Sequence, residues 1–253
     1  MCLVNNERKM ANRRHSLGDE VDLVAKQAKI VSFKDEEKYK HVLRFVHPST
    51  MMVAGPTGSG KTQFVSKLLM EKMFSPEPER IIWVYAQWQP AYDLLQSQIP
   101  MIEFINGLPP NFLGTLSPLV RNLVVLDDQM AEVGGSKDLA QLFTQGSHHR
   151  NLTILYLVQN LFDQAKSMRT VSLNSQYLVL FKSPRDATQI STLGRQMFPH
   201  KSAFLPMAFE DATTLPHSYL LLDLRPETDK RFQVRTRIFP SETPTIVYCP
   251  VGI

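Results

Sequence analysis

The chain has 253 residues, of which 43% are hydrophobic and 21% charged, which is enough for one large α/β domain with a packed core. Its formal net charge of +4 permits a nucleic-acid partner without requiring one. The two cysteines, at opposite ends of the chain, exclude a disulfide scaffold and a cysteine-based zinc site, and favour an intracellular, reducing compartment. No apolar run reaches the roughly 18 residues of a membrane span, so no membrane partner is expected. The N-terminus also lacks the pattern of a secretory signal.

Composition divides the chain into three segments. Residues 1–40 form a polar, charge-mixed arm, residues 41–240 the folded domain, and residues 241–253 a proline-rich tail that we expect to be irregular. A small basic patch over residues 7–15 favours a solvated arm, and a nucleic-acid or localisation arm is the alternative.

Within the domain, short apolar runs alternate with amphipathic ones. We expect six buried strands, at 51–54, 80–86, 101–105, 122–128, 151–160 and 176–181. Helices are expected at 63–74, 90–96, 136–145 and 184–197, a loop or lid at 107–118, and two further strands at 218–224 and 231–239. Phe64, Leu68 and Met73 should share one face of the first helix. Strands alternating with helices predict an α/β fold with a largely parallel sheet covered on both faces.

A glycine-rich loop joins the first strand to the first helix. It consists of Gly55, Pro56, Thr57, Gly58, Ser59, Gly60, Lys61 and Thr62, and fits G-x-x-x-x-G-K-[ST] completely. Glycines let consecutive backbone N–H groups face a phosphate, and the helix N-terminus adds the positive end of its dipole. Lys61 should bridge the β- and γ-phosphates, and the Thr62 hydroxyl should ligate Mg²⁺. The sequence therefore predicts a P-loop NTPase, and the loop alone does not separate motors, switches and kinases. Together with the acidic strand end described next, we expect the ASCE/RecA-like kind, with ATP and Mg²⁺ as cofactors.

Two aspartates end the apolar strand that begins at residue 122. Asp127 at the carboxyl end of a strand can hold the hydration shell of Mg²⁺, as the acidic residue of a Walker B motif does. Asp128 is then placed to polarise the attacking water, where many ATP hydrolases have Glu. The alternative is an aspartate that only caps the next element.

Gln159 follows the most apolar strand of the chain, so it can contact the γ-phosphate or the water and report the nucleotide state. The alternative is an ordinary hydrogen-bonding residue at a strand end. The run 160–163 (Asn-Leu-Phe-Asp) resembles the guanine-reading N-K-x-D motif, but the Lys is missing and the acidic strand lacks D-x-x-G. These departures count against a GTPase switch.

Arg150 precedes this strand, and we predict that it reaches into the nucleotide of a neighbouring subunit from the sheet edge where phosphate-facing residues gather. The alternative is a surface arginine. Arg169 is the second choice, and Arg185 and Arg195 are weaker candidates. His148 and His149 do not predict a metal site, because no further ligand lies near them in the sequence.

Four runs together carry a more specific resemblance: 47–62 (HPSTMMVAGPTGSGKT), 80–95 (RIIWVYAQWQPAYDLL), 146–162 (GSHHRNLTILYLVQNLF) and 169–190 (RTVSLNSQYLVLFKSPRDATQI). They resemble the packaging ATPases of Polinton/Maverick elements and adintovirus-like viruses, which are poxvirus-type packaging ATPases of the FtsK–HerA superfamily. By position, Walker A falls on Gly55–Thr62, Walker B on Asp127 and Asp128, and the polar sensor on Gln159.

The resemblance implies an ATPase that translocates double-stranded DNA as a homo-oligomeric ring and loads a genome into a capsid. Its partners would be DNA of any sequence and capsid or portal-like vertex proteins. It would work in the nucleus or cytoplasm of a host cell or in an assembling virion, and viral and genome-integrated origins both stay open. The alternatives are another P-loop enzyme, either helicase-like or nucleotide-transferring, and a domesticated nucleotide-binding scaffold.

Overall fold

The computed structural model describes residues 21–22, 28–32, 44–127, 139, 142–146, 150–160, 171–183, 187–242 and 244–250. Within these residues the strands form one 11-stranded sheet and a separate two-stranded sheet. The small sheet pairs β3 (Phe45–Val46) with β5 (Phe74–Ser75) in parallel. No helix in the described part of the chain is long and apolar enough to cross a membrane.

One half of the large sheet is parallel and has the order β7-β6-β8-β9-β4-β10. Its strands are β4 (Thr50–Ala54), β6 (Arg80–Tyr85), β7 (Ile102–Asn106), β8 (Asn122–Leu126), β9 (Leu152–Val158) and β10 (Tyr177–Phe181). All six expected strands are confirmed. Four of them, β4, β8, β9 and β10, are buried along their whole length, as continuous apolar runs predict for a sheet covered on both faces.

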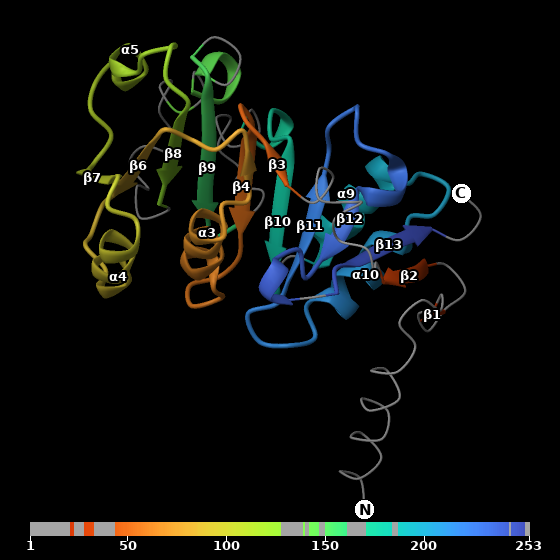
Figure 1. The fold of residues 1–253 in the computed structure, drawn as a ribbon. Coiled ribbons are helices and arrows are strands. Elements are labelled where there is room, and N and C mark those ends of the chain that lie inside the picture. Colours follow the sequence, from red (N-terminus) through yellow and green to blue (C-terminus); the bar gives the residue numbers. More distant parts are fainter. Residues whose placement is uncertain are drawn as a thin grey trace, which may run out of the picture.

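The other half continues from β10 as an antiparallel extension, in the order β11-β12-β13-β2-β1. Its strands are β11 (Tyr219–Asp223), β12 (Val234–Thr236), β13 (Ile246–Pro250), β2 (Ala28–Ser32) and β1 (Val21–Asp22). Two expectations are corrected here. Residues 246–250 of the supposedly irregular tail form a strand, and residues 28–32 of the supposed arm pair with it. Figure 1 shows this half in blue, with β2 in red at its border.

Helices cover both faces of the sheet, which confirms the α/β fold class. Successive residues of β4 point to opposite faces: Met51 and Val53 pack with α3 (Lys61–Met70) and α4 (Pro90–Gln98), whereas Met52 and Ala54 pack with α9 (Ala187–Met197) and α10 (Phe204–Ala212). The second face also holds α5 (Phe112–Thr115), which lies inside the expected loop, and the π-helical turn Leu142–Gly146. Half of the helix expected at 136–145 lies outside the described residues.

Two details of the helices differ from expectation. The helix after the glycine-rich loop ends at Met70, since Lys72 takes a left-handed φ of 52°, so Met73 is buried beyond the helix rather than on its face. Helix α10 is not among the helices expected from the sequence, and it contains Pro206 in its first turn, where proline is tolerated. Short 3₁₀ turns at Lys230–Phe232 and Pro240–Glu242 complete the chain's antiparallel half.

Candidate nucleotide-binding site

The glycine-rich loop leaves the carboxyl end of β4 and enters α3 at Lys61, as the sequence predicts. Gly58 and Gly60 take positive φ angles of 76° and 107°, which side chains with a Cβ rarely adopt. A Cβ on Gly58 would meet no atom within 4 Å, so the loop presents bare backbone at this point. The loop therefore has the open, curled backbone that a phosphate group requires.

Lys61 lies against the same loop. Its Nζ donates to the backbone oxygens of Gly55 at 2.6 Å and Pro56 at 3.2 Å. At the start of α3, Phe64 N donates to Gly60 O at 2.8 Å, so the N–H groups before it lie at the N-terminus of the helix, next to the loop. A flexible cation beside such N–H groups is suited to binding a polyphosphate.

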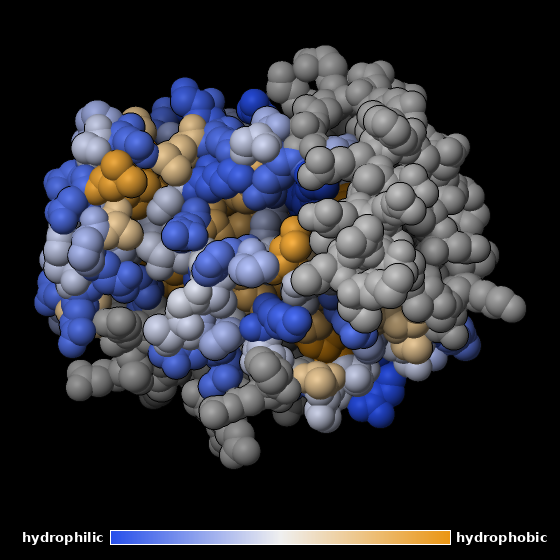
Figure 2. Space-filling model, turned by 90° about the horizontal axis from the view of Figure 1, so that it is seen from below, coloured by the Kyte–Doolittle hydropathy of each residue, from blue (hydrophilic) through white to orange (hydrophobic). Residues whose placement is uncertain are grey.

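The strand order brings Asp127 and Gln159 to the same edge of the sheet as the P-loop. β9 lies between β4 and β8, and Ala54 is opposite Val158 while Leu126 is opposite Tyr156. Asp127 is therefore separated from the start of the P-loop by two strand spacings, about 10 Å measured across the sheet. Gln159 comes directly after β9, between the two, and is exposed. Figure 2 views the molecule from below, toward the edge where β4, β9 and β10 end in Figure 1. Asp128 lies outside the described residues.

Asp127 has a partner that the sequence did not reveal. Its side chain is 5% exposed, and its Oδ2 accepts a short hydrogen bond from the hydroxyl of Tyr92 in α4. Burial and this hydrogen bond raise the pKa of Tyr92 well above its usual range, so the phenol remains a donor. The backbone N–H of Asp127 donates to Val84 O of the neighbouring strand at 3.0 Å. Both main chain and side chain of Asp127 are therefore held in place.

Aromatic rings fix Tyr92 in turn. Four ring centroids lie 5.4–5.8 Å from its own, those of Trp83, Tyr85, Trp88 and Phe104. Tyr92 is fully buried, and its backbone N–H donates to Gln89 O in the first turn of α4. We call these five residues the aromatic cluster.

His217 is a second residue that sequence reasoning missed. It lies between α10 and β11 with a left-handed φ of 59°, and its Nδ1–H donates to the backbone oxygen of Ser59 at 3.2 Å. A Cβ on Gly60 would lie 3.3 Å from the Cβ and Nδ1 of His217, so glycine lets the two segments approach closely. His217 is exposed, so its ring stands at the surface beside the phosphate loop.

Arg150 is half-buried and lies away from the P-loop. Its expected position at the phosphate-facing edge is wrong, because Arg150 precedes β9 and β9 runs parallel to β4. It therefore lies at the opposite edge, and the 7 residues of β9 put about 23 Å between the two edges. Arg195 is in α9 and donates to Thr192 at 3.1 Å. Arg169 and Arg185, like His148 and His149, lie outside the described residues.

The P-loop helix is also tied to the antiparallel half. Lys67 Nζ lies 2.8 Å from Glu242 Oε1 and 4.4 Å from the ring centroid of Phe239. The hydroxyl of Tyr219 donates to Glu242 Oε2 at 2.9 Å. The ring of Phe64 packs against both Tyr219 and Phe239, with centroids at 4.7 and 5.3 Å. The antiparallel half thus supports the helix that carries the phosphate loop.

The residues gathered at this edge fit a nucleoside triphosphate with a divalent cation. The bare backbone at Gly58, the cation Lys61 and the hydroxyl-bearing Thr62 match the phosphates. The buried carboxylate of Asp127 supplies oxygen ligands of the kind that Mg²⁺ prefers, directly or through its water. No cluster of three or more His, Cys, Asp or Glu side chains that could hold a metal occurs among the described residues.

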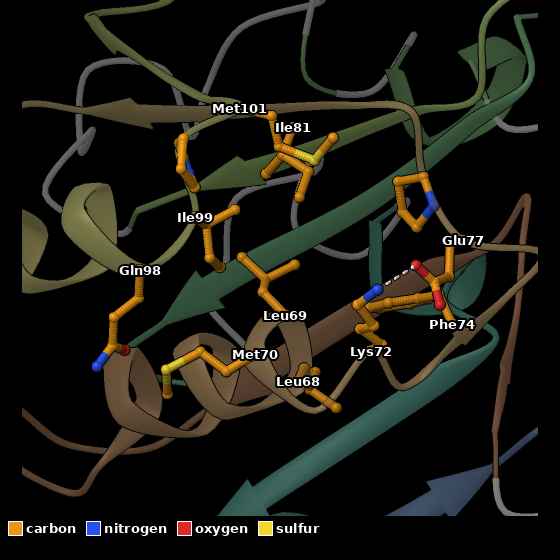
Figure 3. A pocket seen from close by; sticks show the side chains of 12 residues that line it. Leu68, Leu69, Met70, Lys72, Phe74, Glu77, Ile81, Gln98, Ile99 and Met101 are labelled. Atoms are coloured by element: carbon orange, nitrogen blue, oxygen red, sulfur yellow. Dashed lines mark ion pairs between the residues drawn. The ribbon is translucent and has the colours of Figure 1, made fainter.

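A separate cavity of about 620 Å³ lies at the far end of α3 from the P-loop. Figure 3 shows Leu68, Leu69 and Met70 of α3 facing Ile99 and Met101, which follow α4, with the Lys72–Glu77 ion pair at its border. Leu68 is already 7 residues, about 10 Å, along the helix from Lys61. The cavity is therefore distinct from the phosphate loop.

No family model matches the chain, and no curated protein sequence does. Among solved structures the chain is similar to the genome packaging NTPase B204 of Sulfolobus turreted icosahedral virus 2 in complex with ATP-gammaS, at 14% identity and a TM-score of 0.48, with 74% of this chain and 96% of that chain covered. It is similar to B204, the DNA-packaging ATPase of Sulfolobus turreted icosahedral virus, at 11% identity and a TM-score of 0.49, with the same coverage.

A third likeness is to the cytoplasmic domain of the type VII secretion ATPase EccC of Thermomonospora curvata. It has 16% identity and a TM-score of 0.47, and covers 79% of this chain and 25% of that chain. All three likenesses are distant, and no substrate or partner of this chain follows from them.

Proposed function

We propose that this chain is an ATP-driven translocase of double-stranded DNA that packages a genome into a capsid, working as a homo-oligomeric ring. One observation carries the hydrolytic part: the order β8-β9-β4 sets Asp127, Gln159 and the P-loop side by side at one edge. The DNA-packaging part is supported by the sequence resemblance. Three of its four runs, 47–62, 80–95 and 146–162, supply the P-loop, Tyr92 and Gln159, respectively.

The residues divide the work as follows. The backbone of Gly58 to Thr62 holds the phosphates, and Lys61 offsets the negative charge that grows on them during transfer. Asp127 and Thr62 would hold Mg²⁺, which would neutralise negative charge on the phosphates. Asp128 accepts the proton of the attacking water, and Gln159 orients that water or the γ-phosphate.

The test is ATP hydrolysis by the full chain with and without linear double-stranded DNA, with particle sizing in ATP and in its absence. Stimulation should be independent of DNA sequence and should fall steeply with salt, because a translocase contacts the phosphate backbone. Asp128→Asn should bind ATP and not hydrolyse it. Turnover that responds only to a small acceptor would instead indicate a nucleotide-transferring enzyme, and binding without turnover a scaffold.

The ring part of the proposal concerns Arg150. Because about 23 Å separates it from its own P-loop edge, any contact with a γ-phosphate must be made in the neighbouring subunit. Arg150→Ala should then leave nucleotide affinity intact and lower turnover by about 10³-fold or more. Mixing Arg150→Ala with Lys61→Ala subunits should restore part of the activity, since some interfaces regain both groups. If the two kinds of subunit form mixed rings and activity is not restored, Arg150 is a surface residue.

A further inference from the structure

We propose that Tyr92 is a positioning residue for the cation-binding carboxylate, acting only through its hydrogen bond to Asp127. The inference deepens the proposed function and rests on Asp127 holding the cation. A phenol has one proton to donate, and Tyr92 gives it to Oδ2. This bond fixes the rotation of the carboxylate and leaves Oδ1 for the cation's water shell.

Geometry favours positioning over a merely structural role. Both partners are buried, Tyr92 fully and Asp127 at 5% exposure, so the hydrogen bond is little weakened by competing water. Tyr92 belongs to α4, while Asp127 follows β8, and 35 residues separate them in the chain. The four other rings of the aromatic cluster hold Tyr92 so that its hydroxyl meets the carboxylate. Partners of metal-ligating groups typically contribute about 10- to 100-fold to metal affinity or activity.

The test compares Tyr92→Phe with Tyr85→Phe. Both changes remove one hydroxyl from the aromatic cluster and keep the ring. The hydroxyl of Tyr85 makes no hydrogen bond to any residue that the structure describes, which makes it the matched control. The measurement is the affinity for a fluorescent ADP analogue, first in EDTA and then in Mg²⁺.

Tyr92→Phe should bind as tightly as the wild type in EDTA, and in Mg²⁺ it should lose about tenfold or more of the affinity that the cation adds. Tyr85→Phe should match the wild type in both conditions. In turnover, Tyr92→Phe should need about tenfold more Mg²⁺ for half-maximal rate, with kcat largely recovered at saturating Mg²⁺. In an Asp127→Ala background, Tyr92→Phe should cause no further loss.

Equal behaviour of the two variants in Mg²⁺ would overturn the inference. So would a loss by Tyr92→Phe of equal size in EDTA and in Mg²⁺, because that pattern indicates disturbed packing. The assay contains no DNA, so its result is separate from the packaging function. A wild-type chain whose nucleotide affinity does not respond to Mg²⁺ would refute the assignment of Asp127, whereas missing DNA stimulation would refute the translocase alone.

Discussion

In the parallel half of the sheet, β4, β8 and β9 all end at one edge, and the residues that follow them are the P-loop, Asp127 and Gln159. In the antiparallel half, β11, β12 and β13 end at alternating edges, so no comparable set of strand-end residues can gather. The buried polar residues of that half instead include an ion pair, with Asp223 accepting from Arg235 at 2.9 Å. The comparison separates a half that carries the candidate nucleotide site from a half that supports it.

The largest effect should come from the parallel half. Lys61→Ala should lower ATP turnover by about 10³-fold or more, because it removes the cation that offsets charge on the phosphates. Lys72→Ala is the control, since Lys72 lies just beyond the same helix with its side chain 68% exposed. Steady-state hydrolysis assays on both variants provide the measurement. Similar rates for the two would mean that the loop is not catalytic.

Substitutions in the antiparallel half should instead change the free energy of unfolding. Asp223→Asn leaves the buried guanidinium of Arg235 facing a neutral amide, and we expect a loss of about 3–5 kcal/mol in the free energy of unfolding. Asp229→Asn breaks an exposed pair with Arg231 and should change the free energy of unfolding little. Urea unfolding followed by circular dichroism measures both. The folded Asp223→Asn protein should keep its ATP affinity, and a selective loss of that affinity would weaken the separation of the halves.

A smaller effect is expected where the halves meet. His217→Ala removes the hydrogen bond to Ser59 O, which is worth about 0.5–1.5 kcal/mol, so nucleotide affinity should fall about 2- to 10-fold. His200→Ala, which removes another exposed histidine, is the control. Titration with a fluorescent nucleotide measures the affinity. An unchanged affinity in His217→Ala would show that this contact does not shape the loop.

The smallest effect concerns the edge of the parallel half opposite the P-loop. There His47 is buried and contacts Thr153 Oγ1 at 2.7 Å and Asn151 Oδ1 at 3.1 Å. Burial lowers the pKa of His47 below 6.5, so the unfolded chain takes up its proton first as the pH falls. The free energy of unfolding should therefore decline as the pH drops below about 6.5 and level off below the folded-state pKa. His47→Gln should remove this part of the decline in urea unfolding at several pH values, and an unchanged decline would assign it to other groups.

Local sequence predicted the parallel half well because its signals are local: apolar runs, a complete P-loop pattern, and Pro90 at the first turn of α4. The missed features depend on contacts distant in sequence. β13 contains Pro250 and pairs with β2 more than 200 residues away, which a proline-rich composition does not suggest. In the sequence Tyr92 is indistinguishable from an ordinary core residue, and only the fold places it beside Asp127. The expected position of Arg150 is wrong because a residue that precedes a parallel strand lies at the edge where the strands begin. The phosphate loop lies at the opposite edge, where the strands end.

The ion pair between Lys67 and Glu242 joins residues that are 175 positions apart. A ribosome adds about 5–20 residues per second, so the P-loop helix is made roughly 9 to 35 s before this partner emerges. During that interval Phe64 lacks the Tyr219 and Phe239 rings that cover it in the finished protein. The nascent chain therefore carries its P-loop helix with an uncovered aromatic side chain for most of its synthesis, and exposed apolar surface of this kind favours aggregation.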